Sequence, residues 1–302
     1  MRWIMKKISI GSWAYTIGPY AKKPVLWEEV IKKVKELGFD GVELGGFPPH
    51  PNPDNMPEKE QRDACKEQLA ELGLQWSGLA ADLWKQHLID TDDNSGYLEC
   101  FRKNLQFCVD LGIPAIRVDT VHPPTIFDQV DADTARQRVV ETWKICAAGA
   151  ADEGVRMAWE FEPGFAFNKP SDILRIVDEV GHDNFGVMFD TCHGYMVATT
   201  GARQPGKKET LRGGVVELAK KLRGKIKHIH LIDSDGTLHD NETSTHAPFG
   251  KGKIDFDKLL PELAKNDMGH DWWTIDLCFW PDAWAVTKEC KKAVDELNEK
   301  YG

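Results

Sequence analysis

Four apolar segments of the sequence each end in a side chain that could bind a metal ion. They are GVRMAWE, ending at Glu160, FGVMFD, ending at Asp190, KIKHIH, ending at His230, and WWTID, ending at Asp276. A carboxylate at the end of a buried segment needs a cation or a full set of hydrogen-bond donors, because an unpaired buried charge is costly. Three carboxylates and one imidazole form a mixed oxygen and nitrogen set, which suits Mn²⁺, Mg²⁺, Co²⁺ or Zn²⁺. We therefore expect one divalent metal ion, with Mn²⁺ as the first expectation.

Such a centre would favour chemistry beside a carbonyl group. A divalent ion polarises a carbonyl or hydroxyl oxygen and so lowers the cost of forming an enediolate. A carboxylate next to the ion can then move a proton to or from the neighbouring carbon. Because the carboxylates already balance the charge of the ion, the site could still accept a neutral polyol.

The metal-binding candidates belong to a repeated strand and helix pattern. Apolar runs predict strands at 6–11, 39–44, 74–80, 113–121, 155–161, 184–190, 225–232 and 271–277. Helical spacing of apolar residues predicts helices at 26–38, 57–72, 95–111, 133–154, 170–181, 211–223, 254–266 and 283–299. Strict alternation indicates a parallel sheet. Eight units indicate an α/β fold with one closed (β/α)8 TIM barrel, a single domain over residues 1–302, with its site at the C-terminal strand ends.

Two connections of this barrel are expected to be long and irregular. They span residues 194–210 and 233–253, and long loops of this kind often serve a site. For the helix at 170–181, Ser171 or Asp172 is the expected N-cap.

Composition narrows the classes of partner. The formal net charge of −10 argues against nucleic acid, because phosphate binding needs a basic surface. No apolar run reaches the roughly 18 residues of a membrane span, and the N-terminus leads directly into a strand without a signal peptide. Seven cysteines without a CxxC pair favour a reduced, cytoplasmic protein over a disulfide framework.

The chain resembles a known family over nearly its whole length. The segments that carry this resemblance are FDGVEL, GVRMAWE, FGVMFDTCH, IKHIHLID and FGKGKIDF. It resembles the sugar phosphate isomerase/epimerase family, the xylose isomerase-like barrels of the AP endonuclease family 2 superfamily. That group includes ketose 3-epimerases, inosose dehydratase and endonuclease IV. The resemblance implies metal binding by Glu160, Asp190, His230 and Asp276, and it implies an acid/base pair of Glu160 and Asp276.

The chain departs from the family at its last ligand, which is usually glutamate. Asp276 reaches less far by one methylene. The resemblance further implies that His193 contacts the substrate. Relatives in this family often form dimers or tetramers, so a homo-oligomer is expected.

Other residues are candidates for substrate contact. Glu162 points to the same side of an extended backbone as Glu160. Trp13, Trp84 and Trp280 follow strand ends, where indole rings could line a sugar pocket. His246, just before FGKGK, is the candidate for a lid contact.

Several polar residues are open to structural interpretations. Glu43 could reach the pocket or be a satisfied structural carboxylate, whereas His228 is expected to pack against a neighbouring strand. Asp233 is expected to cap a turn, and Arg117 is expected to form a local ion pair with Asp119.

Four functions follow from these features. The first is a metal-dependent isomerase or epimerase of a sugar or keto-sugar, and the second is a lyase that dehydrates an inosose-like ring or cleaves a 3-keto-glycoside. A nuclease resembling endonuclease IV is opposed by the acidic charge and by the single set of ligands. A non-catalytic sugar-binding protein is the fourth.

Overall fold

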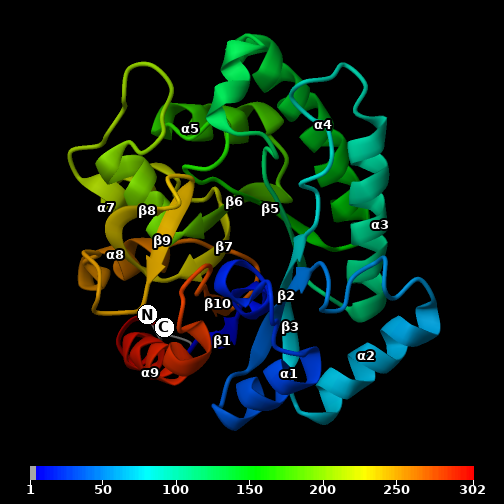
Figure 1. Cartoon of the computed structure of the whole chain (residues 1–302). Coiled ribbons are helices and arrows are strands. Elements are labelled where there is room, and N and C mark those ends of the chain that lie inside the picture. Colours follow the sequence, from blue (N-terminus) through cyan, green and yellow to red (C-terminus); the bar gives the residue numbers. More distant parts are fainter. Residues whose placement is uncertain (1–4) are drawn as a thin grey trace.

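A parallel sheet of eight strands forms the centre of the molecule in the computed structural model, which describes residues 5–302 (Figure 1). In their order around the sheet, the strands are β1 (Lys7–Ile10), β10 (Trp272–Ile275), β7 (Ile226–Leu231), β6 (Phe185–Asp190), β5 (Arg156–Glu160), β4 (Ala115–Val118), β3 (Gln75–Ala81) and β2 (Gly41–Gly46). A single parallel bridge between Gly11 and Glu43 joins the two ends of this order. The predicted (β/α)8 barrel is confirmed.

Helices alternate with the strands and surround the barrel (Figure 1). They are α1 (Trp27–Glu36), α2 (Lys59–Glu71), α3 (Ser95–Leu111), α4 (Ala132–Asp152), α5 (Pro170–Val180), α7 (Gly214–Lys221), α8 (Phe256–Leu263) and α9 (Ala283–Tyr301). Each turns an apolar stripe toward the sheet, as α1 does with Trp27, Val30 and Val34. The main core therefore lies between the sheet and the helices, where Trp143 of α4 packs against Trp159 of β5 with ring centroids 5.2 Å apart.

The two connections expected to be irregular contain regular structure. The first begins with a short helix, α6 (Thr191–Tyr195), and a π-helical turn at Met196–Thr200. The second folds as an antiparallel hairpin of β8 (Asp233–His239) and β9 (Thr243–Ala247). The sequence TLHDNETST in this hairpin is almost wholly polar, so it lacks the alternation of apolar residues by which strands are predicted.

The expected N-cap of α5 is also wrong. Lys169 occupies that position, and Pro170 is the first helical residue. The carboxylate of Glu209 takes the place of a local cap, since it accepts a hydrogen bond from Ser171 N at 2.9 Å.

The last helix, α9, lies beside the first strand, β1 (Figure 1). Asn298 of α9 accepts from Lys6 N at 2.8 Å and donates to Lys6 O at 2.8 Å. This pair of bonds ties the last helix to the segment that enters β1. Within residues 5–302, every helix is too short or too polar to cross a membrane.

Candidate metal centre and substrate cavity

The four side chains predicted to bind a metal converge at one place. Glu160, Asp190, His230 and Asp276 are all buried, and one potential ligand atom of each lies within 4.8 Å of the others. Metal bonds of about 2.1 Å place opposite ligands about 4.2 Å apart. The spacing of the four side chains is therefore slightly wider than that of ligands around a bound ion.

Strand order explains why these residues meet. The strands β10, β7, β6 and β5 are consecutive neighbours in the barrel, and Asp190 is paired in register with His230. Glu160 and Asp190 are the last residues of their strands, and Asp276 directly follows β10. Because parallel strands share one C-terminal rim, all four side chains reach the same mouth of the barrel.

Two of the carboxylates are held by donors that leave one oxygen free. Asp190 Oδ1 accepts from the backbone N–H of His193 at 2.7 Å, so the residue also caps α6. Asp276 Oδ1 accepts from Trp13 Nε1 at 2.9 Å and from Cys278 N at 2.8 Å. The remaining Oδ2 atoms both face the cluster.

Glu160 is oriented by a buried arginine. Arg117 Nη1 donates to Glu160 Oε2 at 2.7 Å, and Arg117 Nη2 donates to Asp119 Oδ2 at 3.0 Å. Burial raises the pKa of Glu160, but the charge of Arg117 together with the contacts of His230 and His193 outweighs this effect and lowers that pKa to about 2. The expected pair of Arg117 with Asp119 is present, and its contact with Glu160 was missed. A lone arginine within the apolar strand AIRV was the available signal for an inward-facing charge.

The side chain of Glu43 contacts and positions the ring of His230. His230 Nε2 lies 3.1 Å from Glu43 Oε1, and His230 Nδ1 lies 3.0 Å from Glu160 Oε1. Glu43 also accepts from His228 Nε2 at 2.7 Å and from Thr274 Oγ1 at 2.9 Å. Glu43 is therefore a satisfied carboxylate inside the barrel, and it accepts a hydrogen bond from His230 when the hydrogen is on Nε2. In that tautomer Nδ1 would be the metal-binding atom, with a carboxylate behind the histidine as is usual for a metal ligand.

The residues present fit a divalent cation. Among the described residues, Asp190 Oδ2 is a buried oxygen without a hydrogen-bond partner, and an orphaned buried charge of this kind calls for a cation. Three carboxylate oxygens and one imidazole nitrogen match the donor preferences of Mn²⁺, Co²⁺ and Zn²⁺.

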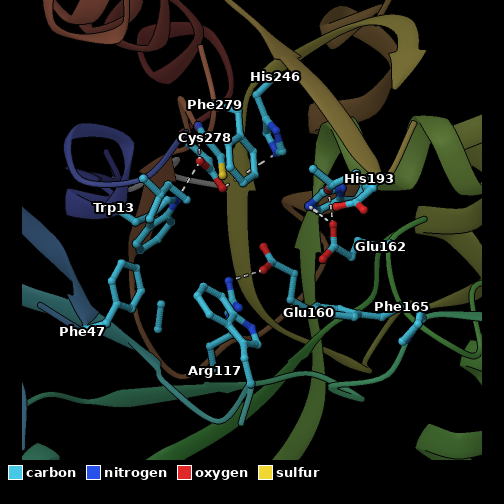
Figure 2. A pocket seen from close by; sticks show the side chains of 18 of the residues that line it. Trp13, Phe47, Arg117, Glu160, Glu162, Phe165, His193, His246, Cys278 and Phe279 are labelled. Carbon is cyan, nitrogen blue, oxygen red and sulfur yellow. Dashed lines mark hydrogen bonds and ion pairs between the residues drawn. The ribbon is translucent and has the colours of Figure 1, made fainter. Parts of the chain in front are cut away.

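The cluster opens into a cavity of about 430 Å³ (Figure 2). Its polar side is formed by Arg117, Glu160, Glu162, His193, His246 and Asp276. Its apolar side is formed by Trp13, Ile17, Phe47, Trp84, Phe165 and Phe279. In Figure 2, Trp13 and Phe47 lie across the cavity from His193 and Glu162.

Five of the six residues predicted to bind substrate line this cavity: Trp13, Trp84, Glu162, His193 and His246. The sixth, Trp280, lies instead in an adjacent hollow beside Phe279. Trp84 is held by a hydrogen bond from its Nε1 to Asp119 Oδ2 at 2.9 Å.

The polar side of the cavity contains two groups supported by the hairpin. His193 Nδ1 lies 2.8 Å from Ser244 Oγ, and Thr243 Oγ1 donates to Glu162. His193 Nε2 is 3.7 Å from Glu162 Oε2. Burial raises the pKa of Glu162, so this carboxyl is a better proton donor than Glu160.

His246 is buried on β9, whereas its sequence position suggested a lid contact. Its Nε2 lies 3.7 Å from Asp190 Oδ2 and 3.8 Å from Asp276 Oδ2. Figure 2 shows the ring pointing inward beside Phe279.

The sequence comparison establishes the family. The family model described as xylose isomerase-like TIM barrel matches residues 31–296. The chain therefore belongs to the xylose isomerase-like TIM barrel family. No curated protein matches the chain by sequence.

Solved structures share the fold across almost the entire chain. The IOLI protein with a bound zinc atom aligns with 98% of this chain and 99% of its own, at a TM-score of 0.73 and 20% identity. D-psicose 3-epimerase with D-tagatose, from Clostridium cellulolyticum H10, aligns with 98% of this chain and 99% of its own, at a TM-score of 0.72 and 16% identity. The probable 3-DHS dehydratase AsbF of Bacillus anthracis aligns with 96% of this chain and 98% of its own, at a TM-score of 0.71 and 17% identity.

Proposed function

We propose that this protein is a divalent-metal-dependent isomerase or epimerase that acts on a sugar or keto-sugar by carboxylate proton transfer through an enediolate. The observation that carries the proposal is the placement of two acids around one ligand nitrogen. Glu160 Oε1 lies 3.0 Å and Asp276 Oδ2 lies 3.6 Å from His230 Nδ1, and both residues line the same cavity.

The bound ion would act as a Lewis acid toward the substrate oxygens, with Mn²⁺ as our first choice and Mg²⁺, Co²⁺ and Zn²⁺ as alternatives. Glu160 would take a proton from the carbon beside the carbonyl, because Arg117 keeps this carboxylate ionised. Asp276 would return a proton from the other side. Its pKa is also lowered, since His246 and His230 together outweigh the effect of burial, so the proton that it returns would be taken up from solvent in each turnover.

The remaining cavity residues would hold the substrate. His193 and Glu162 present a ring nitrogen and a carboxyl oxygen to sugar hydroxyls, and the indole rings of Trp13 and Trp84 offer faces for the apolar side of a sugar ring. The D-psicose 3-epimerase among the structural relatives supports this class of reaction. All seven cysteines are unpaired, which supports a reducing, cytoplasmic setting.

A lyase is the second candidate, and the apolar side of the cavity favours it. The rings of Phe47, Phe165 and Phe279 exceed what a free sugar needs, and they would accommodate an aromatic or bulky group attached to the sugar. After Glu160 takes the proton, the C–O bond at the β-carbon would break, and the leaving oxygen would keep the bonding electrons. Glu162 would protonate that oxygen, and a carbon–carbon double bond conjugated with the carbonyl would remain.

Turnover in deuterated water separates these functions. The Mn²⁺-loaded protein is incubated with free ketohexoses and with 3-keto-glycosides, and the products are followed by NMR and mass spectrometry. An isomerase or epimerase incorporates deuterium next to the carbonyl and keeps the glycosidic bond. A lyase releases the alcohol and leaves an unsaturated ketone. If neither deuterium uptake nor bond cleavage occurs with any substrate of either class, the proposed function is contradicted.

A further inference from the structure

His246 places a buried ring nitrogen beside two of the four predicted ligands. The residue is 1% exposed, and its Nε2 has no hydrogen-bond partner among the described residues. Its Nδ1 lies 3.1 Å from the backbone oxygen of Ser244. A carbonyl oxygen can only accept, so Nδ1 carries the hydrogen and Nε2 keeps a lone pair in the neutral ring.

That lone pair faces two carboxylate oxygens. Nε2 is 3.7 Å from Asp190 Oδ2 and 3.8 Å from Asp276 Oδ2. Asp190 Oδ2 is itself without a partner in residues 5–302. In the neutral ring, Nε2 and Asp190 Oδ2 are two acceptors that face each other across a buried gap too wide for a hydrogen bond. A cation between them satisfies both, and ligand atoms 3.7 Å apart fit metal bonds of about 2.1 Å at a wide angle.

The same pattern holds for every residue of the cluster. In each, one polar atom is bound by a neighbour and the other is left for the centre. The binding neighbours are Arg117 for Glu160, the His193 N–H for Asp190, Glu43 for His230, Trp13 and Cys278 N for Asp276, and Ser244 O for His246. His246 therefore has the arrangement of a ligand.

The backbone holds His246 in this place without help from a metal. His246 pairs with Ser234 across the hairpin, and Cys192 Sγ donates to Thr245 O at 3.2 Å. Asp233, at the base of the hairpin, accepts hydrogen bonds from Gly250 N at 3.1 Å and Gly252 N at 2.9 Å. Such a preformed position is what a ligand on a hairpin requires.

We infer that His246 is a fifth ligand of the metal, so that the centre is formed by three carboxylate oxygens and two imidazole nitrogens. The inference rests on the proposed metal centre. It also accounts for aspartate rather than glutamate at position 276. The shorter side chain approaches the ion less closely, and the second imidazole adds a further bond. An additional imidazole also favours Co²⁺ and Zn²⁺ over Mg²⁺, which prefers oxygen ligands.

The test compares three histidine variants by metal affinity, measured in competition with a chromophoric chelator for Zn²⁺, Co²⁺ and Mn²⁺. H246A should weaken Zn²⁺ and Co²⁺ binding at least about tenfold and Mn²⁺ binding less. It should also change the visible absorption of the Co²⁺ protein. H239A is the matched control, because His239 lies on the other strand of the hairpin and stacks on Phe279. It should bind all three ions like the wild type.

X-ray absorption of the Zn²⁺-loaded wild type gives an answer independent of any variant, and it should show two imidazoles per zinc. One imidazole, or unchanged affinity and an unchanged Co²⁺ spectrum in H246A, overturns the fifth ligand. In that case loss of binding in H230A, the third variant, still supports the four-ligand centre and the proposed function. A wild type that binds none of the ions overturns both.

Discussion

Arg117 and Glu43 would act on the proposed metal centre through its ligands. Arg117 fixes one oxygen of Glu160, and Glu43 fixes one nitrogen of His230. Both are buried, and both approach from inside the barrel. These contacts leave Glu160 Oε1 and His230 Nδ1 facing each other at 3.0 Å, and supporting residues orient the ligands of metal sites in this way.

Glu160 and Glu162 offer a matched test at this scale. E160Q removes the proposed base and one ligand charge, so turnover should fall at least about 100-fold and metal affinity should fall with it. E162Q makes the same chemical change two residues away, outside the four-ligand group, and should keep wild-type metal affinity. Isothermal titration with Mn²⁺ and steady-state kinetics measure the two effects. Equal loss of metal binding in both variants would refute the assignment of Glu160 as the ligand.

The hairpin of β8 and β9 was not predicted from the sequence. Its role depends on Asp233, whose side chain accepts from four backbone N–H groups, those of Ser234, Gly250, Gly252 and Ile254. Asp233 was expected to cap a turn, and the structure shows that it does. The closeness of this packing is visible at Gly252, where an added Cβ would lie 2.2 Å from Asp233 Oδ1.

D233N should loosen the hairpin because the amide nitrogen cannot accept the hydrogen bonds that one carboxylate oxygen accepts. We expect a loss of about 1–3 kcal/mol in the free energy of unfolding, faster proteolysis within residues 233–253 and weaker metal binding. D235N is the control, since within residues 5–302 the side chain of Asp235 accepts hydrogen bonds only from Thr237, on the outer part of the hairpin. Urea unfolding and limited proteolysis measure these effects. The assigned role of Asp233 is wrong if the two variants behave alike.

The barrel itself was predictable because its strands are nearly continuous apolar runs and its helices carry regular apolar stripes. The clustering of the four proposed ligands was predictable because each lies at the end of such a run. The hairpin and α6 carry no comparable pattern. The contact of Arg117 with Glu160 and the approach of His246 to Asp190 join residues that are distant in sequence, so only the folded barrel brings them together.

At the scale of the whole molecule, closure of the barrel depends on the contacts of the first strand, β1, with β2 and with the last helix, α9. Strands β1 and β2 meet through one bridge, while Asn298 of α9 binds Lys6 beside β1. N298A removes two hydrogen bonds and leaves two partly buried backbone groups of Lys6 unpaired, so it should lower the free energy of unfolding by about 1–3 kcal/mol. E299A, an exposed neighbour on the same helix, should change it little. A thermal midpoint of N298A equal to that of E299A would contradict this role.

The central claim is that one divalent ion lies between Glu160, Asp190, His230 and Asp276 at the mouth of the barrel. A crystal structure of the Mn²⁺-loaded protein, with anomalous diffraction to locate manganese, tests it most directly. We predict one strong anomalous peak per chain, within bonding distance of Glu160 Oε1, Asp190 Oδ2, His230 Nδ1 and Asp276 Oδ2. No peak at this place, or a peak bound by a different set of side chains, would contradict the claim.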